Sequence, residues 1–230
     1  GNITAGGSGK TPLVIWLVEF LRANGYTPGV ISRGYGREDD VVREVSARST
    51  AAEVGDEPLL IFRRASCPVV VARHRVEAAQ ALLQKNPQGN VIISDDGLQH
   101  YSLARDMEIC VIDGARGFGN GLLIPAGPLR ETTARLNQVD AIIVNGDNKN
   151  NSIKSNAYKT SMKLAGAQFL QLKNAQQTAR AENFHGKNIH AIAGIGNPAR
   201  FFAHLKSLGL QCTEHAFPDH HIFNAEDIAF

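Results

Sequence analysis

The segment GNITAGGSGKTP (residues 1–12) combines closely spaced glycines with a lysine and a threonine. Phosphate-binding loops follow the pattern G-x-x-x-x-G-K-[ST], in which successive backbone N–H groups can surround an anion. Gly9, Lys10 and Thr11 supply the end of that pattern, whereas Thr4 stands where its first glycine is expected. A helix that begins here would direct its positive dipole end at the phosphates, so we predict a nucleotide site in preference to a plain glycine turn. The predicted site consists of Thr4, Ala5, Gly6, Gly7, Ser8, Gly9, Lys10 and Thr11.

Two adjacent aspartates are the second feature with chemical potential. The segment VIISDDGLQH (residues 91–100) sets Asp95 and Asp96 directly after a short apolar run. In proteins with a phosphate loop, the loop threonine and an acidic residue at the tip of a neighbouring strand hold Mg²⁺. Adjacent side chains on a strand point in opposite directions, so one carboxylate would meet the metal and the other a structural partner or a second ligand. Thr11, Asp95 and Asp96 are therefore candidate Mg²⁺ ligands, and an Asp-Gly turn is the simpler alternative.

Three further segments carry residues that suit phosphoryl transfer. In VGDEPLL (residues 54–60), Asp56 could orient or deprotonate an attacking hydroxyl, although it could also cap a helix that has Pro58 in its first turn. In FPDHHIF (residues 217–223), His220 could share a proton near neutral pH, although surface or core histidines are common. Arg130 could stabilise charge on a transferring phosphoryl group, but a surface salt bridge explains it equally well.

The composition of the chain restricts the classes of protein to which it can belong. Its 230 residues include 43% apolar and 20% charged residues, which allows a sizeable core and argues against bulk disorder. The net charge is +2 and the sequence has no block of basic residues, so we expect no nucleic-acid partner. Three distant cysteines, Cys67, Cys110 and Cys212, are typical of reduced core residues and favour the cytosol. No apolar run reaches the length of a membrane span.

Short Val/Ile-rich runs that alternate with helices are typical of a sheet covered on both faces. We therefore predict an α/β fold like that of P-loop NTPases, with a mostly parallel sheet, helices on both faces and a second, smaller α/β unit. Ligands collect at the carboxyl ends of such strands, where the double aspartate falls. The predicted elements are helices at 11–24, 75–85 and 199–208, and strands at 28–32, 69–72, 91–94, 108–112, 141–144 and 189–193.

Domain organisation follows from a polar stretch near the middle of the chain. The segment NGDNKNNSIKSN (residues 145–156) is predicted to be a linker, so residues 1–150 form the nucleotide-binding domain and residues 151–230 the smaller unit. Residues 158–164 and 168–172 are expected to pair as a hairpin around Ala165 and Gly166. Because a phosphate loop normally follows a buried strand, and the segment after residue 223 is predicted to start a helix, we expect this sequence to be a fragment of a longer chain.

Seven motifs in a fixed order connect the sequence to a known family. GNITAGGSGKTP, SRGYGR, GDEP, DDGLQH, PAGPLRE, AGIGNP and FPDHH follow one another along nearly the whole chain. This set resembles the tetraacyldisaccharide 4'-kinases, which phosphorylate a lipid A precursor, and the loop with Thr4 is similar to the family's own form. The resemblance implies two α/β units with the site between them, joined partly by a β-ribbon. It also implies an amino-terminal membrane-associated helix, a strand that feeds the loop and a continuation beyond residue 230, which we expect in the longer chain.

The resemblance also implies an activity and a set of site residues. The γ-phosphate of ATP would pass, with Mg²⁺, to the 4'-hydroxyl of a tetraacylated glucosamine disaccharide at the cytosolic face of the inner membrane of Gram-negative bacteria. Asp56 matches the family's catalytic aspartate and His220 the histidine paired with it. Asp95 and Asp96 match its acidic pair, and the family pattern adds Arg130 near the phosphates and Glu131 near the metal. We expect a monomer that associates peripherally with the membrane.

Two other functions are compatible with the phosphate loop alone. A switch or partitioning ATPase would use the loop to drive association and would have no small acceptor. A small-molecule kinase or ligase of the same broad fold would act on a soluble acceptor. The destination of the phosphate distinguishes these from a lipid kinase.

Overall fold

The chain forms two compact units, Gly1–Lys163 and Leu164–Phe230. The computed structural model describes residues 1–147, 153–164 and 166–230. The predicted linker at 145–156 therefore lies partly outside the described residues, and its first residue ends a strand. Ala165, expected in a hairpin turn, also lies outside them.

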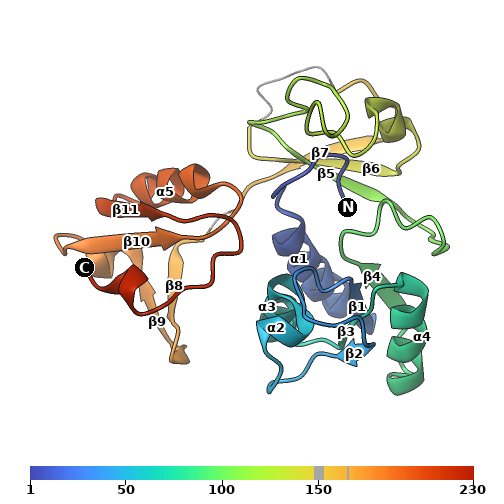
Figure 1. The fold of residues 1–230 in the computed structure, drawn as a ribbon, viewed down its shortest axis with the longest axis horizontal. Helices are drawn as coiled ribbons and strands as arrows, with labels where there is room; N and C mark the ends of the chain where they lie inside the picture. Colours follow the sequence, from blue (N-terminus) through green and yellow to red (C-terminus); the bar gives the residue numbers. More distant parts are fainter. Residues whose placement is uncertain (148–152, 165) are drawn as a thin grey trace. The chain divides into compact units, whose positions relative to one another are not determined.

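The first sheet of the first unit is built from short strands in the order β2-β3-β1-β4, of which all but the charged β2 are mainly apolar (Figure 1). Strands β1, β3 and β4 run parallel, and only the short edge strand β2 is antiparallel. These strands are β1 (Pro28–Ser32), β2 (Arg43–Glu44), β3 (Val69–Val71) and β4 (Val91–Ser94). The helices around this sheet are α1 (Lys10–Ala23), α2 (Ala51–Val54), α3 (Asp56–Ala65) and α4 (Arg75–Lys85).

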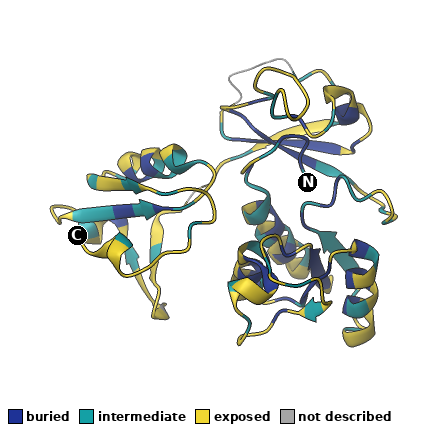
Figure 2. Ribbon diagram, in the orientation of Figure 1, coloured by how far each residue is buried: buried dark blue, intermediate teal, exposed yellow. Residues whose placement is uncertain are grey.

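Helices cover both faces of this sheet because neighbouring residues of β1 point to opposite sides. Val30 packs in one core cluster with Val18 of α1 and Ile61 of α3. Ile31 packs in another cluster with Leu82 of α4. Figure 2 shows the central strands β1 and β3 as buried and the edge strand β4 as intermediate, with the helices exposed on their outer sides. The predicted parallel α/β fold with helices on both faces is confirmed.

A second parallel sheet completes the first unit, with strands β5 (Ile109–Asp113), β6 (Ala141–Asn145) and β7 (Tyr158–Met162) in that order. The nitrogen of Gly1 donates to the carbonyl of Ile109, and the Val111 amide donates to the carbonyl of Gly1, so the first residues run beside β5. Leu13 of α1 packs against Val111 and Ile143. Helix α1 therefore contacts both sheets. A short 3₁₀ helix, Thr133–Asn137, lies between β5 and β6.

The predicted hairpin at 158–172 is wrong. Strand β7 pairs in parallel with β6, with Tyr158 opposite Ala141. Strand β8 (Gln168–Gln171) pairs instead with β9 (Asn174–Arg180), in antiparallel register. Tyr158–Met162 is polar and forms the edge of its sheet, so its residue pattern does not indicate which strand it pairs with.

The second unit contains the β8–β9 hairpin, a two-stranded parallel sheet and a helix that packs against that sheet. Phe202 and Leu205 of the helix share a core with Ala191 and Ala193. Its remaining elements are 3₁₀ helix Ala181–Phe184, β10 (Ile189–Ala193), α5 (Pro198–Ser207), β11 (Cys212–Ala216) and 3₁₀ helix Glu226–Ile228. Within the described residues, no helix is both long and apolar enough to cross a bilayer.

Candidate phosphate-binding and phosphoryl-transfer site

The glycine-rich loop ends in a conformation that requires its last glycine. Gly9 is the N-cap of α1 and has a φ of 91°, in the left-handed region. A Cβ atom at this position would also lie 2.2 Å from Nδ2 of Asn145, so no other residue fits without displacing that side chain. The loop therefore turns sharply into α1, and the N-terminus of the helix faces the loop, as phosphate binding requires.

Four consecutive backbone amides of the loop are available to a ligand. The N–H groups of Gly6, Gly7, Ser8 and Gly9 have no hydrogen-bond partner within the described part of the chain. The amide of Ala5 is different, because it donates to the carbonyl of Pro128 at 2.7 Å. An anion cradle would therefore use the amides that follow Ala5, and Ala5 itself serves to anchor the loop.

Buried polar side chains hold the loop from behind. Asn2 donates its Nδ2 to Oγ of Ser8 at 3.1 Å, and Asn145, at the end of β6, donates its Nδ2 to the carbonyl of Ser8 at 3.0 Å. All three residues are fully or almost fully buried. Thr4 forms a β-bridge with Leu129, which ties the loop to the segment that carries Arg130. The loop is therefore fixed before any nucleotide arrives.

Asp96 pairs with two basic residues of the predicted site, Lys10 and Arg130. Its Oδ1 lies 3.6 Å from Nζ of Lys10, and its Oδ2 lies 2.8 Å from a guanidinium nitrogen of Arg130. Burial alone would raise the pKa of Asp96, but the charge of Lys10 and the hydrogen bond from Arg130 outweigh it, and the net pKa is lowered. The structure thus brings Lys10, Asp96 and Arg130 together at the carboxyl end of β4.

Asp95, the neighbouring residue, is more deeply buried and has no ion pair of this kind among the described residues. It is 1% exposed, and its Oδ1, like that of Asp96, accepts no hydrogen bond within the described part of the chain. Burial, followed by the charge of Asp96, raises the pKa of Asp95. Behind it, the buried guanidinium of Arg75 donates to the Asp95 carbonyl at 3.1 Å and fixes the backbone there. Burial also lowers the pKa of Arg75, to about 10.

Burying a carboxylate oxygen that accepts no hydrogen bond costs free energy unless a ligand interacts with that oxygen. Asp95 Oδ1 therefore fits a role as a Mg²⁺ ligand or as acceptor from a Mg²⁺-bound water. Among the described residues no group of three or more His, Cys, Asp or Glu could by itself hold a metal ion. Mg²⁺ in nucleotide sites needs only one or two protein ligands, because phosphates and waters supply the rest.

Glu131 lies beside this cluster but is occupied by other side chains. Gln99 donates to its Oε1 at 2.5 Å, Tyr101 donates to its Oε2, and Arg135 lies 3.4 Å from the same oxygen. Gln99 also contacts Arg130 at 3.5 Å. Both oxygens of Glu131 are thus engaged by side chains, and its predicted place near the metal stays a prediction.

Asp56 is exposed at the beginning of α3, which packs against α1. The alternative that it caps this helix is wrong, because Gly55 is the N-cap and Asp56 is the first helical residue. Its carboxylate still gains from the positive end of the helix. Pro58 lies within the first turn, as expected.

His220 belongs to the second unit, so its predicted pairing with Asp56 stays a prediction. It is exposed and has a φ of 58°. It lies 4.0 Å from a carboxylate oxygen of Asp219.

Several residues of the site escaped sequence reasoning. Asn2 and Asn145 act through contacts with Ser8, and Arg75 through a contact with the Asp95 backbone. Arg116, in the turn after β5, donates to the carbonyl of Gly7 at 3.3 Å, so its guanidinium lies over the phosphate loop. The only available signal was position, since Asn145 and Arg116 follow the carboxyl ends of buried strands.

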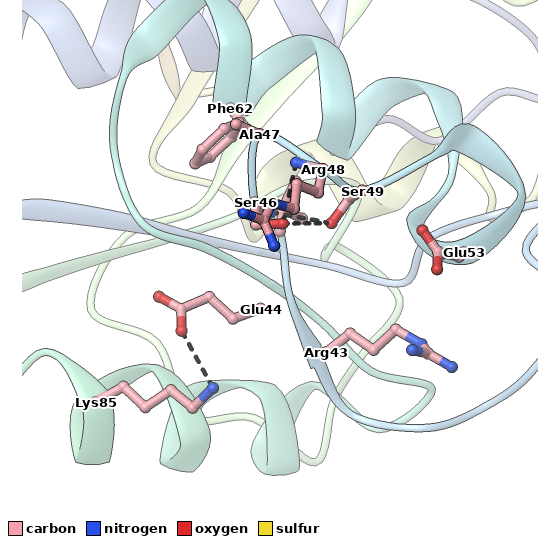
Figure 3. A pocket seen from close by; sticks show the side chains of 10 residues that line it. Arg43, Glu44, Ser46, Ala47, Arg48, Ser49, Glu53, Phe62 and Lys85 are labelled. Carbon is pink, nitrogen blue, oxygen red and sulfur yellow. Dashed lines mark hydrogen bonds and ion pairs between the residues drawn. The ribbon is translucent and has the colours of Figure 1, made fainter.

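A pocket of about 580 Å³ lies elsewhere in the first unit (Figure 3). Its lining includes Glu44, Glu53 and Lys85, and the Lys85 ammonium pairs with Glu44 at 3.1 Å. None of its described lining residues belongs to the predicted site. We assign this pocket no part in the chemistry.

A parallel α/β fold, a glycine loop with free amides before a helix, and a lysine and a double aspartate at one sheet edge together define a P-loop phosphotransferase. Comparison with known proteins is more specific. The family model described as "Tetraacyldisaccharide-1-P 4'-kinase" matches residues 1–230, and the chain belongs to this family.

Individual relatives agree with this assignment. The tetraacyldisaccharide 4'-kinase of Dechloromonas aromatica is 51% identical over 231 residues, which cover 100% of this chain and 69% of the relative. That of Methylobacillus flagellatus is 49% identical, with 100% and 67% covered. A crystal structure of LpxK from Aquifex aeolicus in complex with ATP matches with a TM-score of 0.76 and 28% identity, covering 96% of this chain and 70% of that one.

Proposed function

We propose that this chain transfers the γ-phosphoryl group of ATP to the 4'-hydroxyl of a tetraacylated glucosamine disaccharide. As a member of its family, the chain is an ATP-dependent kinase that uses Mg²⁺. We further propose that it acts as a monomer on a lipid substrate, peripherally at the cytosolic face of the inner membrane of a Gram-negative bacterium. The observation that carries the phosphate site is the run of four partnerless amides directly before Lys10.

The phosphates of ATP would lie against these amides, at the N-terminus of α1. Lys10 and Arg130 would neutralise charge on the transferring group, which is the main task of the protein in phosphoryl transfer. Both cations pair with Asp96, which places them at the same end of β4. Bound Mg²⁺, held by Thr11 and Asp95 with Asp96 beside them, would supply further charge neutralisation.

Asp56 would accept the proton of the sugar hydroxyl as its oxygen attacks the γ-phosphorus. The bond from that phosphorus to the β–γ bridging oxygen breaks, and ADP leaves. His220 would share or tune the proton on Asp56. Asp56 lies in the first turn of α3, where the positive end of the helix dipole favours a negative charge.

The destination of the phosphate tests this proposal. The full chain would be supplied with ATP labelled at its γ-phosphate and with the acylated disaccharide, a soluble glucosamine disaccharide, or no acceptor. We expect label on the acylated disaccharide alone. Label on the soluble sugar would favour a small-molecule kinase, and release of inorganic phosphate without an acceptor would favour a switch ATPase.

A further inference from the structure

The two adjacent histidines of the FPDHHIF segment have different surroundings. His220 is exposed, whereas His221 is half-buried. Nε2 of His221 lies 2.9 Å from Oδ2 of Asp227, six residues further along. The second histidine is therefore tied into the unit, while the first projects from it.

His220 adopts a left-handed backbone conformation. Its φ of 58° lies in the left-handed region, which is uncommon for a residue other than glycine. The turn that contains it is closed by a hydrogen bond from the His221 amide to the Pro218 carbonyl at 3.2 Å. Just before the turn, the Phe217 amide donates to the carbonyl of Ala193 at 2.8 Å. Such a conformation persists only where the surroundings impose it.

The side chain of His221 supplies that constraint on the far side of the turn. Its ring stacks on Phe217, with centroids 4.7 Å apart, and meets the edge of Phe223 at 5.0 Å. A Cβ atom at Gly194 would lie 3.3 Å from the His221 Cβ, so the turn packs directly against the backbone that follows β10. His221 is thus fixed by aromatic rings on two sides and by Asp227 at its tip.

Asp227 is itself held by the backbone. Its Oδ2 accepts the Asn224 amide at 2.9 Å, and the Asn224 side chain accepts the amides of Glu226 and Asp227. The Asn224 amide, followed by the hydrogen bond from His221, lowers the pKa of Asp227. Because the carboxylate stays ionised at neutral pH, it accepts from His221 and holds that ring with its proton on Nε2.

We propose that His221 and Asp227 form a positioning pair that imposes the left-handed turn and presents the imidazole of His220 to the reaction. This inference rests on the proposed catalytic role of His220. It assigns different tasks to two residues that are chemically identical: His220 handles the proton, and His221 holds the turn. Asp227 acts through His221 and does not contact the substrate.

Steady-state kinetics of the full chain test the positioning role. In Asp227→Ala we expect kcat to fall about 10–100-fold, the range for removing a residue that orients a functional one, with KM for ATP little changed. Asp227→Asn keeps an oxygen that can accept from Nε2, so it should restore most of the loss. Glu226→Gln removes a neighbouring acidic charge whose side chain takes no part in the pair, and it should behave like the wild type.

Nuclear magnetic resonance of ¹⁵N-histidine-labelled protein provides a readout independent of activity. We expect His221 to carry its proton on Nε2 in the wild type, and Asp227→Ala to shift the ring signals of both His221 and His220. An active wild type together with an equally active Asp227→Ala variant would overturn the inference. So would His221 signals that are identical in the two proteins. A wild type that transfers no phosphate would instead overturn the proposed function, and the spectra would still decide whether the pair holds the turn.

Discussion

The predicted site residues lie in two contrasting kinds of surroundings. At the carboxyl end of β4, Lys10 and Arg130 each form an ion pair with Asp96, and Asp95 is buried beside it. Asp56 and His220, to which proton transfer is assigned, are exposed. Their positions are set by backbone features, a helix beginning in one case and a left-handed turn in the other.

The difference follows from what each group must do. Charge on a phosphoryl group is stabilised best by partners that are fixed and shielded from water in advance. A proton acceptor must instead reach an acceptor molecule that comes and goes, so it is better placed on the surface of a rigid element. Substitutions in the ion-paired cluster should therefore affect nucleotide use and stability together, whereas those at Asp56 and His220 should affect turnover alone.

The largest effect is expected for Lys10→Ala. Losing this cation removes charge neutralisation from the transition state and leaves Asp96 with one partner fewer, so kcat/KM should fall by about 10³-fold or more. Phosphoryl transfer and ATP binding would be measured side by side, with Lys85→Ala as the control because Lys85 pairs with Glu44 away from the site. Normal kinetics in Lys10→Ala would remove the phosphate-loop interpretation.

Asp56→Ala tests the exposed side of the comparison. We expect kcat to drop by about 10²–10⁴-fold, the usual range for loss of a general base, while the affinity for ATP stays nearly the same. Binding would be followed by calorimetry, and Asp40→Ala, which removes an exposed carboxylate paired with Arg73, serves as the control. If turnover persists in Asp56→Ala, another group accepts the proton.

Asn145→Ala tests whether the phosphate loop must be held rigid. The substitution leaves the buried Ser8 carbonyl without the Asn145 amide, which should lower the free energy of unfolding by about 1–3 kcal/mol. A loosened cradle should also raise KM for ATP and leave kcat nearly unchanged. Asn86→Ala, which removes a similar amide-to-carbonyl contact at the end of α4, should change stability only. An unchanged KM in Asn145→Ala would show that the loop needs no such support.

Local patterns predicted much of this molecule. Helix α4 and strands β1, β4 and β10 have the predicted limits, because continuous Val/Ile runs and capped helical segments are encoded within a few residues. The pairing of β7 with β6 was missed, because a polar edge strand reveals nothing about its neighbour. The Asp56 cap was wrong for a smaller reason, since Gly55 takes that position with a left-handed φ.

The candidate site divides in the same way. The loop, Lys10 and the double aspartate carry motifs that short stretches of sequence reveal. Asn145, by contrast, contacts Ser8 across 137 residues, and Arg75 contacts the Asp95 backbone across 20. Contacts from side chain to backbone leave no local pattern, so residues that support the site become visible only in the folded chain.

The smallest effects are expected when Asp95 or Asp96 is replaced by asparagine. Each substitution should change the free energy of unfolding by about 1 kcal/mol, with opposite signs for the two residues. The folded-state pKa of Asp95 is raised, so its ionised form opposes folding above that pKa, and Asp95→Asn should raise the melting temperature at pH 7 by about 2–4 °C. The folded-state pKa of Asp96 is lowered, so its ionised form favours folding, and Asp96→Asn should lower the melting temperature.

Asp96 loses its contribution as the pH falls below its ordinary pKa of 3.8 towards the folded value. The unfavourable contribution of Asp95 disappears at a higher pH, as it protonates. Melting curves of both variants and the wild type between pH 3 and pH 7 would check this order. Shifts of the same sign at pH 7 would show that the two carboxylates share one environment, and the contrast drawn between them would fail.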